Sequence, residues 1–273
     1  MMTLTDEDFH RLVRFVKDNY GIDLSKKKQL IIGRLSNTIN AMGLGSFREY
    51  TDRIISKKNS EDIESLLNHL TTNYTFFMRE EEHFNFFRNT VLPYLEQVKK
   101  DHVLSIWSAG CSTGEEPYTI SMILKEYFGT KAGRWDTRIL ATDISQNVLK
   151  AAQEAVYDKE SLSHLPAEWV RKYFRTTGEK DVYTVSQTLK DNVIYRTFNL
   201  MDPIRFRLKF DVIFCRNVMI YFDQKTKNDL ISRFYNATVP GGYLMIGHSE
   251  SLDRAHINYQ FLQPSIYRKP LNK

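Results

Sequence analysis

The stretch VLSIWSAGCSTGEEPYTI, residues 103–120, decides the fold. Its apolar start at 103–109 predicts a buried strand, and residues 115–128 predict a helix. Between them lies AGCSTG, a small-residue loop that lets the backbone approach a ligand closely. A strand, a glycine loop and a helix in this order predict the first unit of an open α/β sheet with its ligand on the loop.

The same rhythm continues toward the C-terminus. Further buried strands are predicted at 138–143, 209–217 and 242–248, with helices at 145–155 and 224–238 between them. Buried strands separated by such helices predict a parallel sheet covered by helices on both faces.

The remaining sequence suggests two additions to this sheet. Residues before about 90 show helical patterning, which predicts a helical N-terminal domain with its connecting segment at 1–90 and an α/β domain at 91–273. Residues 178–197 alternate apolar and polar side chains without a crossover helix, so we expect an antiparallel ribbon there.

Two acids on the glycine loop restrict the ligand. Glu115 and Glu116 stand at the start of the predicted helix, where they would repel a phosphate, so NAD, FAD, ATP and a dinucleotide oxidoreductase are disfavoured. Asp143 ends the next strand, where an acid accepts hydrogen bonds from ribose hydroxyls. A phosphate-free nucleoside with cationic groups, such as S-adenosylmethionine, fits both features. The acids could instead complement the helix dipole, and Asp143 could form an Asx turn.

Composition limits the partner and the compartment. The longest apolar runs fall far below the roughly 20 residues of a membrane-spanning helix, and no signal peptide is recognisable, so we expect a cytoplasmic protein without membrane insertion. Residues 11–58 hold eleven Lys/Arg against four Asp/Glu, which favours an acidic partner, although a solvated face remains open. We find no nucleic-acid recognition pattern and no metal-ligand spacing, and we expect neither partner.

Five motifs in chain order resemble the CheR family, the chemotaxis-receptor glutamate methyltransferases. They are TNYTFFMR (72–79), WSAGCSTGEEPYTI (107–120), ATDIS (141–145), FCRNVMIYFD (214–223) and GHSE (247–250). The resemblance implies a Rossmann-like class I S-adenosylmethionine-dependent methyltransferase sheet with a small antiparallel β-subdomain, preceded by an all-α domain. It also implies methyl transfer from S-adenosylmethionine to glutamates on the cytoplasmic helical bundle of chemoreceptors, giving methyl esters and S-adenosylhomocysteine in chemotactic adaptation at membrane receptor arrays.

The resemblance also assigns residues to the site. The cofactor contacts it implies are Asn73, Thr75, Arg79, Glu115, Glu116, Asp143, Asn199, Leu200, Arg216 and Asn217. Glu116 is preferred over Glu115, which fits a helix-end acid. Arg79 and Tyr221 are the catalytic candidates: Arg79 could hold a carboxylate, and Tyr221 could donate a hydrogen bond. An ion pair of Arg79 with residues 80–82 and a purely structural Tyr221 remain open.

A glutamate acceptor simplifies the chemistry. Its unperturbed pKa is near ~4.3, so at neutral pH it is already a nucleophile and needs no general base. Orientation of the carboxylate and the methyl group can then contribute roughly 7–11 kcal/mol.

Partner binding gives three further expectations. Lys27 and Arg34 lie seven residues apart on one helix face, and we expect them to meet the acidic receptor surface. The turn TTGEKDVY (176–183) holds the single Gly178, unlike the longer glycine-containing turn of members that bind a receptor's C-terminal tether, so we expect no tether binding. We expect a monomer. A non-catalytic S-adenosylmethionine-binding docking module is the second hypothesis.

Overall fold

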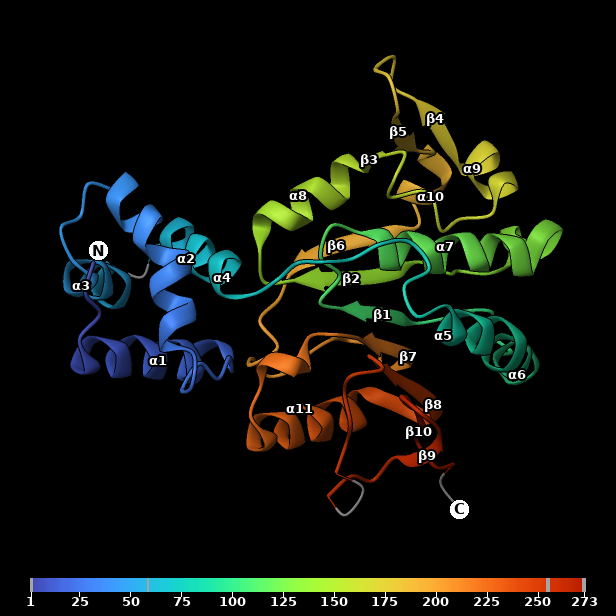
Figure 1. Ribbon diagram of the computed structural model, residues 1–273. Coiled ribbons are helices and arrows are strands. Elements are labelled where there is room, and N and C mark those ends of the chain that lie inside the picture. The colour runs from blue at the N-terminus through green and yellow to red at the C-terminus, as the bar shows by residue number, and fades with distance from the viewer. Residues whose placement is uncertain (1, 58, 254–255, 272–273) are drawn as a thin grey trace.

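The computed structural model describes residues 2–57, 59–253 and 256–271 (Figure 1). Four helices form the N-terminal domain: α1 (Asp6–Tyr20), α2 (Lys28–Ala41), α3 (Phe47–Lys57) and α4 (Ser60–Leu70). The side chain of Thr5 caps α1 by accepting from the Asp8 N–H, with the acidic first turn expected at a helix start. Of the basic residues counted above, Lys58 and the Lys57 side chain lie outside the described part. No described helix is long and apolar enough to cross a membrane.

A connecting segment without regular structure follows α4 and runs past the central sheet to α5 (Glu81–Phe86) (Figure 1). A π-helical turn at Phe87–Val91 leads into α6 (Leu92–Val98). Phe77 of the connecting segment, Phe84 of α5 and Phe87 of the π-helical turn are buried in the core. The aromatic stretch is therefore packed and is not a free linker.

The central sheet has seven strands in the order β6-β2-β1-β7-β8-β10-β9. The first five are parallel, and β10 and β9 extend the sheet in antiparallel pairing. The strands are β1 (Ile106–Ala109), β2 (Ile139–Asp143), β6 (Val193–Thr197), β7 (Phe210–Cys215), β8 (Thr238–Ile246), β9 (Gln260–Gln263) and β10 (Ile266–Arg268). The expected parallel α/β sheet is therefore confirmed.

Helices cover both faces of this sheet. Alternate residues of β7 enter different cores: Val212 and Phe214 pack with α7 (Glu115–Phe128), whereas Ile213 and Cys215 pack with α11 (Gln224–Ala237). Helix α8 (Gln146–Glu154) belongs to the first core and begins at the predicted N-cap Ser145. The N-terminal helices share the second core, and their domain meets the α/β domain at the loops and helix starts beyond the strands, for example where Ile22 pairs with Phe222.

The small antiparallel sheet differs from its prediction. It consists of β3 (Val156–Asp158), β4 (Phe174–Thr176) and β5 (Val182–Val185) in the order β3-β5-β4, with α9 (Ala167–Tyr173) before β4. The antiparallel ribbon expected at 178–197 is wrong in its second half. A short helix, α10 (Gln187–Lys190), follows β5, and β6 then pairs in parallel with β2. In the edge strand β6, Val193 and Tyr195 are buried, Ile194 is partly exposed, and the last two residues are exposed, so its sequence resembles that of a hairpin strand.

Candidate active site

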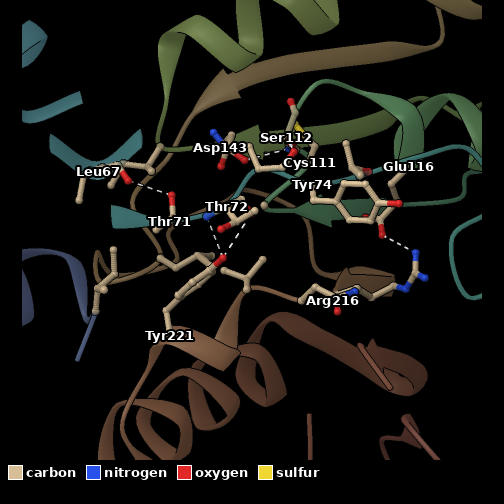
Figure 2. A pocket seen from close by; sticks show the side chains of 18 of the residues that line it. Leu67, Thr71, Thr72, Tyr74, Cys111, Ser112, Glu116, Asp143, Arg216 and Tyr221 are labelled. Carbon is tan, nitrogen blue, oxygen red and sulfur yellow. Dashed lines mark hydrogen bonds and ion pairs between the residues drawn. The ribbon is translucent and has the colours of Figure 1, made fainter. Parts of the chain in front are cut away.

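A cavity opens beyond the carboxyl ends of β1, β2 and β7, beneath the segment that joins the two domains (Figure 2). Most of the residues that the sequence assigned to the site line it: Asn73, Thr75, Arg79, Glu116, Asp143, Asn199, Leu200, Arg216, Asn217 and Tyr221. Glu115, Lys27 and Arg34 are not among its lining residues. Residues from the connecting segment and from the loops that follow several strands thus meet at one site.

The glycine loop after β1 forms one wall of the cavity, and several of its residues have a left-handed backbone conformation. Gly110 has φ +87°, and a Cβ there would lie 2.3 Å from a methyl group of Val218. The Ser112 N–H donates to Oδ2 of Asp143 at 2.9 Å, and the Ser145 N–H donates to Oδ1 at 3.1 Å. Asp143 therefore forms the Asx turn and lines the cavity at once. Burial raises the pKa of Asp143, although these N–H donors act in the opposite direction.

The two acids of the loop point to different surroundings. Glu115 is buried outside the cavity, where its carboxylate accepts from the Thr113 hydroxyl at 2.7 Å and burial raises its pKa. Glu116 lines the cavity and accepts from the Ser108 hydroxyl at 2.6 Å and from Nη1 of Arg216 at 2.8 Å. Only Glu116 is placed to face a ligand.

Arg216 is a buried junction at the end of β7. Its Nη1 pairs with Glu116, its Nε donates to Nδ1 of His83 at 3.0 Å, and its Nη2 donates to Glu80 at 3.1 Å and to the carbonyl oxygen of Arg79. These bonds fix the segment before α5 to the glycine-loop helix. Arg216 thus acts in the structure as a hydrogen-bonded wall of the cavity.

Glu80, His83 and His248 bring possible metal-ligating atoms within 4.8 Å of one another. Arg216 donates to both Glu80 and His83, and its positive charge opposes a cation at the same place. Burial and Arg216 lower the pKa of His83 to about 3, so this ring is neutral. These contacts account for the cluster without an ion, and the expected lack of a metal stays a prediction.

The two catalytic candidates both contact the connecting segment. Arg79 donates to the carbonyl oxygen of Tyr74, with its guanidinium 5.7 Å from the Tyr74 ring centroid. It forms no ion pair within 4.0 Å with any acid in the described residues, so the alternative pairing with 80–82 is absent there. The Tyr221 hydroxyl accepts the Thr72 N–H at 2.9 Å and donates to the Thr72 carbonyl oxygen at 3.2 Å (Figure 2). Tyr221 therefore closes the segment over the cavity.

Family models match the two parts of the chain. The CheR methyltransferase all-alpha domain matches residues 7–71, and the CheR methyltransferase SAM binding domain, where SAM is S-adenosylmethionine, matches residues 73–267. The chain belongs to the CheR methyltransferase family. The two matches meet at Thr72, the residue held by Tyr221. Most of the residues that line the cavity lie within the SAM-binding match, and the all-alpha match contributes Tyr20, Ile22, Leu67 and Thr71.

Relatives match along nearly the whole chain. The chemotaxis protein methyltransferase of Borreliella burgdorferi is 40% identical and covers 98% of this chain and 96% of the relative. Chemotaxis protein methyltransferase 1 of Pseudomonas aeruginosa is 35% identical, covering 98% and 99%, and the Escherichia coli chemotaxis protein methyltransferase is 34% identical, covering 97% and 92%. The all-α domain followed by a SAM-binding α/β domain, implied by the resemblance, is confirmed.

The remaining predicted residues lie along the domain boundary or on the surface. Asn199 donates from Nδ2 to the Asn19 carbonyl oxygen at 2.8 Å, which ties the cavity rim to α1. Lys27 is exposed at the start of α2. Arg34 donates from Nη1 to the carbonyl oxygens of His69 at 3.0 Å and Thr71 at 3.1 Å, so it caps the end of α4 while remaining exposed.

Three further residues shape the site and were not expected from the sequence. Ser108 binds Glu116, Thr72 binds Tyr221, and Glu80 binds Arg216 and accepts from the His248 N–H at 3.1 Å. Thr72 begins the motif TNYTFFMR and Glu80 follows it directly, so their position in the sequence was a usable signal. Ser108 stood in an apolar strand, where a lone buried hydroxyl demands a partner.

Proposed function

We propose that this protein transfers the methyl group of S-adenosylmethionine to glutamate side chains on the cytoplasmic helical bundle of chemoreceptors. The products are glutamate methyl esters and S-adenosylhomocysteine. Two findings support the reaction class: the SAM-binding family model spans the cavity, and relatives at 34–40% identity are chemotaxis protein methyltransferases. The chemistry of the cavity supports a glutamate as the acceptor.

The observation that carries this proposal is an arginine at the cavity wall without a free general base beside it. Among the described lining residues, Glu116 is paired with Arg216 and Ser108, and Asp143 accepts two backbone N–H groups. Burial raises the pKa of the Cys111 thiol, so it is no base at neutral pH. Acceptors such as hydroxyls and amines need a proton removed, whereas a carboxylate does not.

The residues then act mainly by placement. The cofactor supplies an electrophilic methyl group, and the glutamate oxygen forms a bond to it as the bond to sulfur breaks. Arg79 orients a carboxylate, because a guanidinium matches the two oxygens of that group. Tyr221 and its Thr72 partner hold the connecting segment over the cavity.

The cofactor itself fits the polar lining. Asp143 is assigned to the ribose hydroxyls, and Glu116 complements the cofactor's positive charge. The other proposed contacts are Asn73, Thr75, Arg79, Asn199, Leu200, Arg216 and Asn217. Glu115 is proposed to act indirectly by holding Thr113 in the loop.

The N-terminal domain is proposed to meet the acidic receptor surface. Lys27 is exposed and free to steer it, whereas Arg34 contributes charge while it holds the end of α4. A cytoplasmic location at receptor arrays, a monomeric state and independence of a receptor tether belong to the same proposal. Measurable binding of a receptor C-terminal peptide would contradict the last point.

Methyl-labelled cofactor tests the function directly. The protein is incubated with receptor cytoplasmic fragments, and we expect base-labile label that disappears when the target glutamates are replaced by glutamine. Label that persists on the glutamine fragment would exclude glutamate esterification. Cofactor binding without any label transfer would favour the docking-module hypothesis.

A further inference from the structure

Glu64 of α4 joins the N-terminal domain to the first turn of α8. Its Oε1 accepts from the Ser145 hydroxyl at 2.8 Å and from the Asn147 N–H at 2.5 Å. Ser145 is the N-cap of α8 and also accepts from the Val148 N–H. The Glu64 carboxylate thus satisfies an amide at the positive end of α8, where a negative charge is favourable.

The same N-cap residue is bonded to the acid of the cavity. The Ser145 N–H donates to Asp143 at 3.1 Å, and Asp143 in turn accepts the Ser112 N–H of the glycine loop at 2.9 Å. A continuous hydrogen-bonded path therefore runs from α4 to the glycine loop through Glu64, Ser145, Asp143 and Ser112. It crosses the boundary between the two domains.

Helix α4 also supplies part of the cavity wall. Leu67 lies one turn after Glu64, is buried, and lines the cavity together with Thr71 at the end of the helix. A movement of α4 relative to α8 would therefore move Leu67 and Thr71 relative to Asp143, which lines the same cavity. Across the cavity, Tyr221 holds Thr72, so the connecting segment is fastened on both sides.

We propose that Glu64 is a positioning residue for cofactor binding, which holds α4 against α8 so that the Leu67 wall and Asp143 keep the spacing that the ligand needs. The proposal rests on the S-adenosylmethionine-binding function above. Without the Glu64 carboxylate, a smaller fraction of the protein molecules has α4 in the position that binds the cofactor. The apparent dissociation constant rises in inverse proportion to that fraction.

Calorimetric binding of S-adenosylhomocysteine to the full chain tests this role without turnover. We expect Glu64→Ala to weaken binding about tenfold, the loss of a charged hydrogen-bond acceptor. Glu64→Gln keeps an acceptor oxygen and recovers part of the affinity. Ser145→Ala weakens binding as well, and the double variant binds no more weakly than the weaker single variant, because both changes break one path.

Glu61→Ala is the matched control, because it removes an exposed acid of the same helix. It leaves the affinity unchanged. Hydrogen exchange on the ligand-free protein adds a second readout: the Asn147 amide exchanges faster in Glu64→Ala and not in Glu61→Ala. Equal affinities for Glu64→Ala and Glu61→Ala, with a wild type that binds, would overturn the role of Glu64. A wild type that fails to bind would instead contradict the proposed function.

Discussion

The Tyr221 hydroxyl and the Thr72 backbone form two hydrogen bonds, 2.9 Å from the Thr72 N–H and 3.2 Å to its carbonyl oxygen. The hydroxyl thus holds the connecting segment both as an acceptor and as a donor of a hydrogen bond. We expect Tyr221→Phe to lower kcat/KM about tenfold, the loss of hydrogen bonds at a partly buried site. Initial rates with labelled cofactor measure this. Tyr20→Phe removes another hydroxyl from the cavity lining and serves as the control. An equal loss of kcat/KM in both variants would contradict a specific role for the hydrogen bonds between Tyr221 and Thr72.

Arg79 is expected to need its guanidinium and not only its charge. Arg79→Lys retains a cation but cannot match a carboxylate with two parallel donors, so we expect kcat to fall by about 10²-fold. Steady-state kinetics at saturating cofactor measure the effect. Arg88→Lys changes an exposed arginine beyond α5 and should leave kcat unchanged. Full activity of Arg79→Lys would show that a point charge suffices.

Charge reversal at Lys27 tests the receptor surface. We expect Lys27→Glu to raise the KM for the receptor fragment several-fold at low salt, with the difference shrinking as ionic strength rises, because exposed charges are screened. Lys209→Glu is the matched control, since Lys209 is exposed and lies at the amino end of β7, whereas the cavity lies beyond the carboxyl end of that strand. If both variants behaved alike, the N-terminal face would not steer the receptor.

His83 is expected to make the fold acid-sensitive. Burial and the Arg216 charge lower its pKa to about 3, whereas an unfolded histidine titrates near ~6.5. As the pH falls, the unfolded state therefore binds a proton at this histidine before the folded state does. The free energy of unfolding accordingly falls as the pH drops from about 6.5 toward 3. Glu80 acts in the same direction, because Arg216 and neighbouring donors outweigh burial and lower its pKa.

Substitution at this position tests the acid sensitivity. We expect His83→Asn to reduce the pH dependence of the unfolding free energy by about one proton between roughly pH 6.5 and 5. At neutral pH the variant should also lose about 1–3 kcal/mol of unfolding free energy, because the smaller asparagine leaves space at this buried position while its amide oxygen replaces Nδ1 as the acceptor for Arg216. Urea unfolding across this pH range measures both, with the exposed His10→Asn as control. An unchanged slope would mean that His83 binds its proton over the same pH range in the folded and the unfolded protein.

The repeating strand and helix units could be predicted because their signals are local. Ser145 as the cap of α8, the acidic start of α1 and the strand that precedes the glycine loop are each encoded within a few residues. The edge strand β6 was misassigned for a physical reason. Buried, partly exposed and fully exposed residues follow one another in β6, so its sequence resembles an antiparallel strand although it pairs in parallel with β2.

The sequence predicted which residues line the cavity, but it did not predict which residues they contact. Arg216 was expected to face the cofactor, yet its partners His83 and Glu80 lie more than a hundred positions away along the chain. The link from Glu64 to Ser145 likewise joins two domains. Such pairs depend on how the domains pack, which no local pattern encodes.

Site mapping by mass spectrometry tests the central claim most directly. A receptor cytoplasmic fragment is incubated with the protein and S-adenosylmethionine, digested at mildly acidic pH and sequenced. We expect the added mass of one methyl group on glutamate side chains, removed by mild base and absent when Arg79 is replaced by alanine. Methylation on any other residue type, or a modification that survives base, would contradict it.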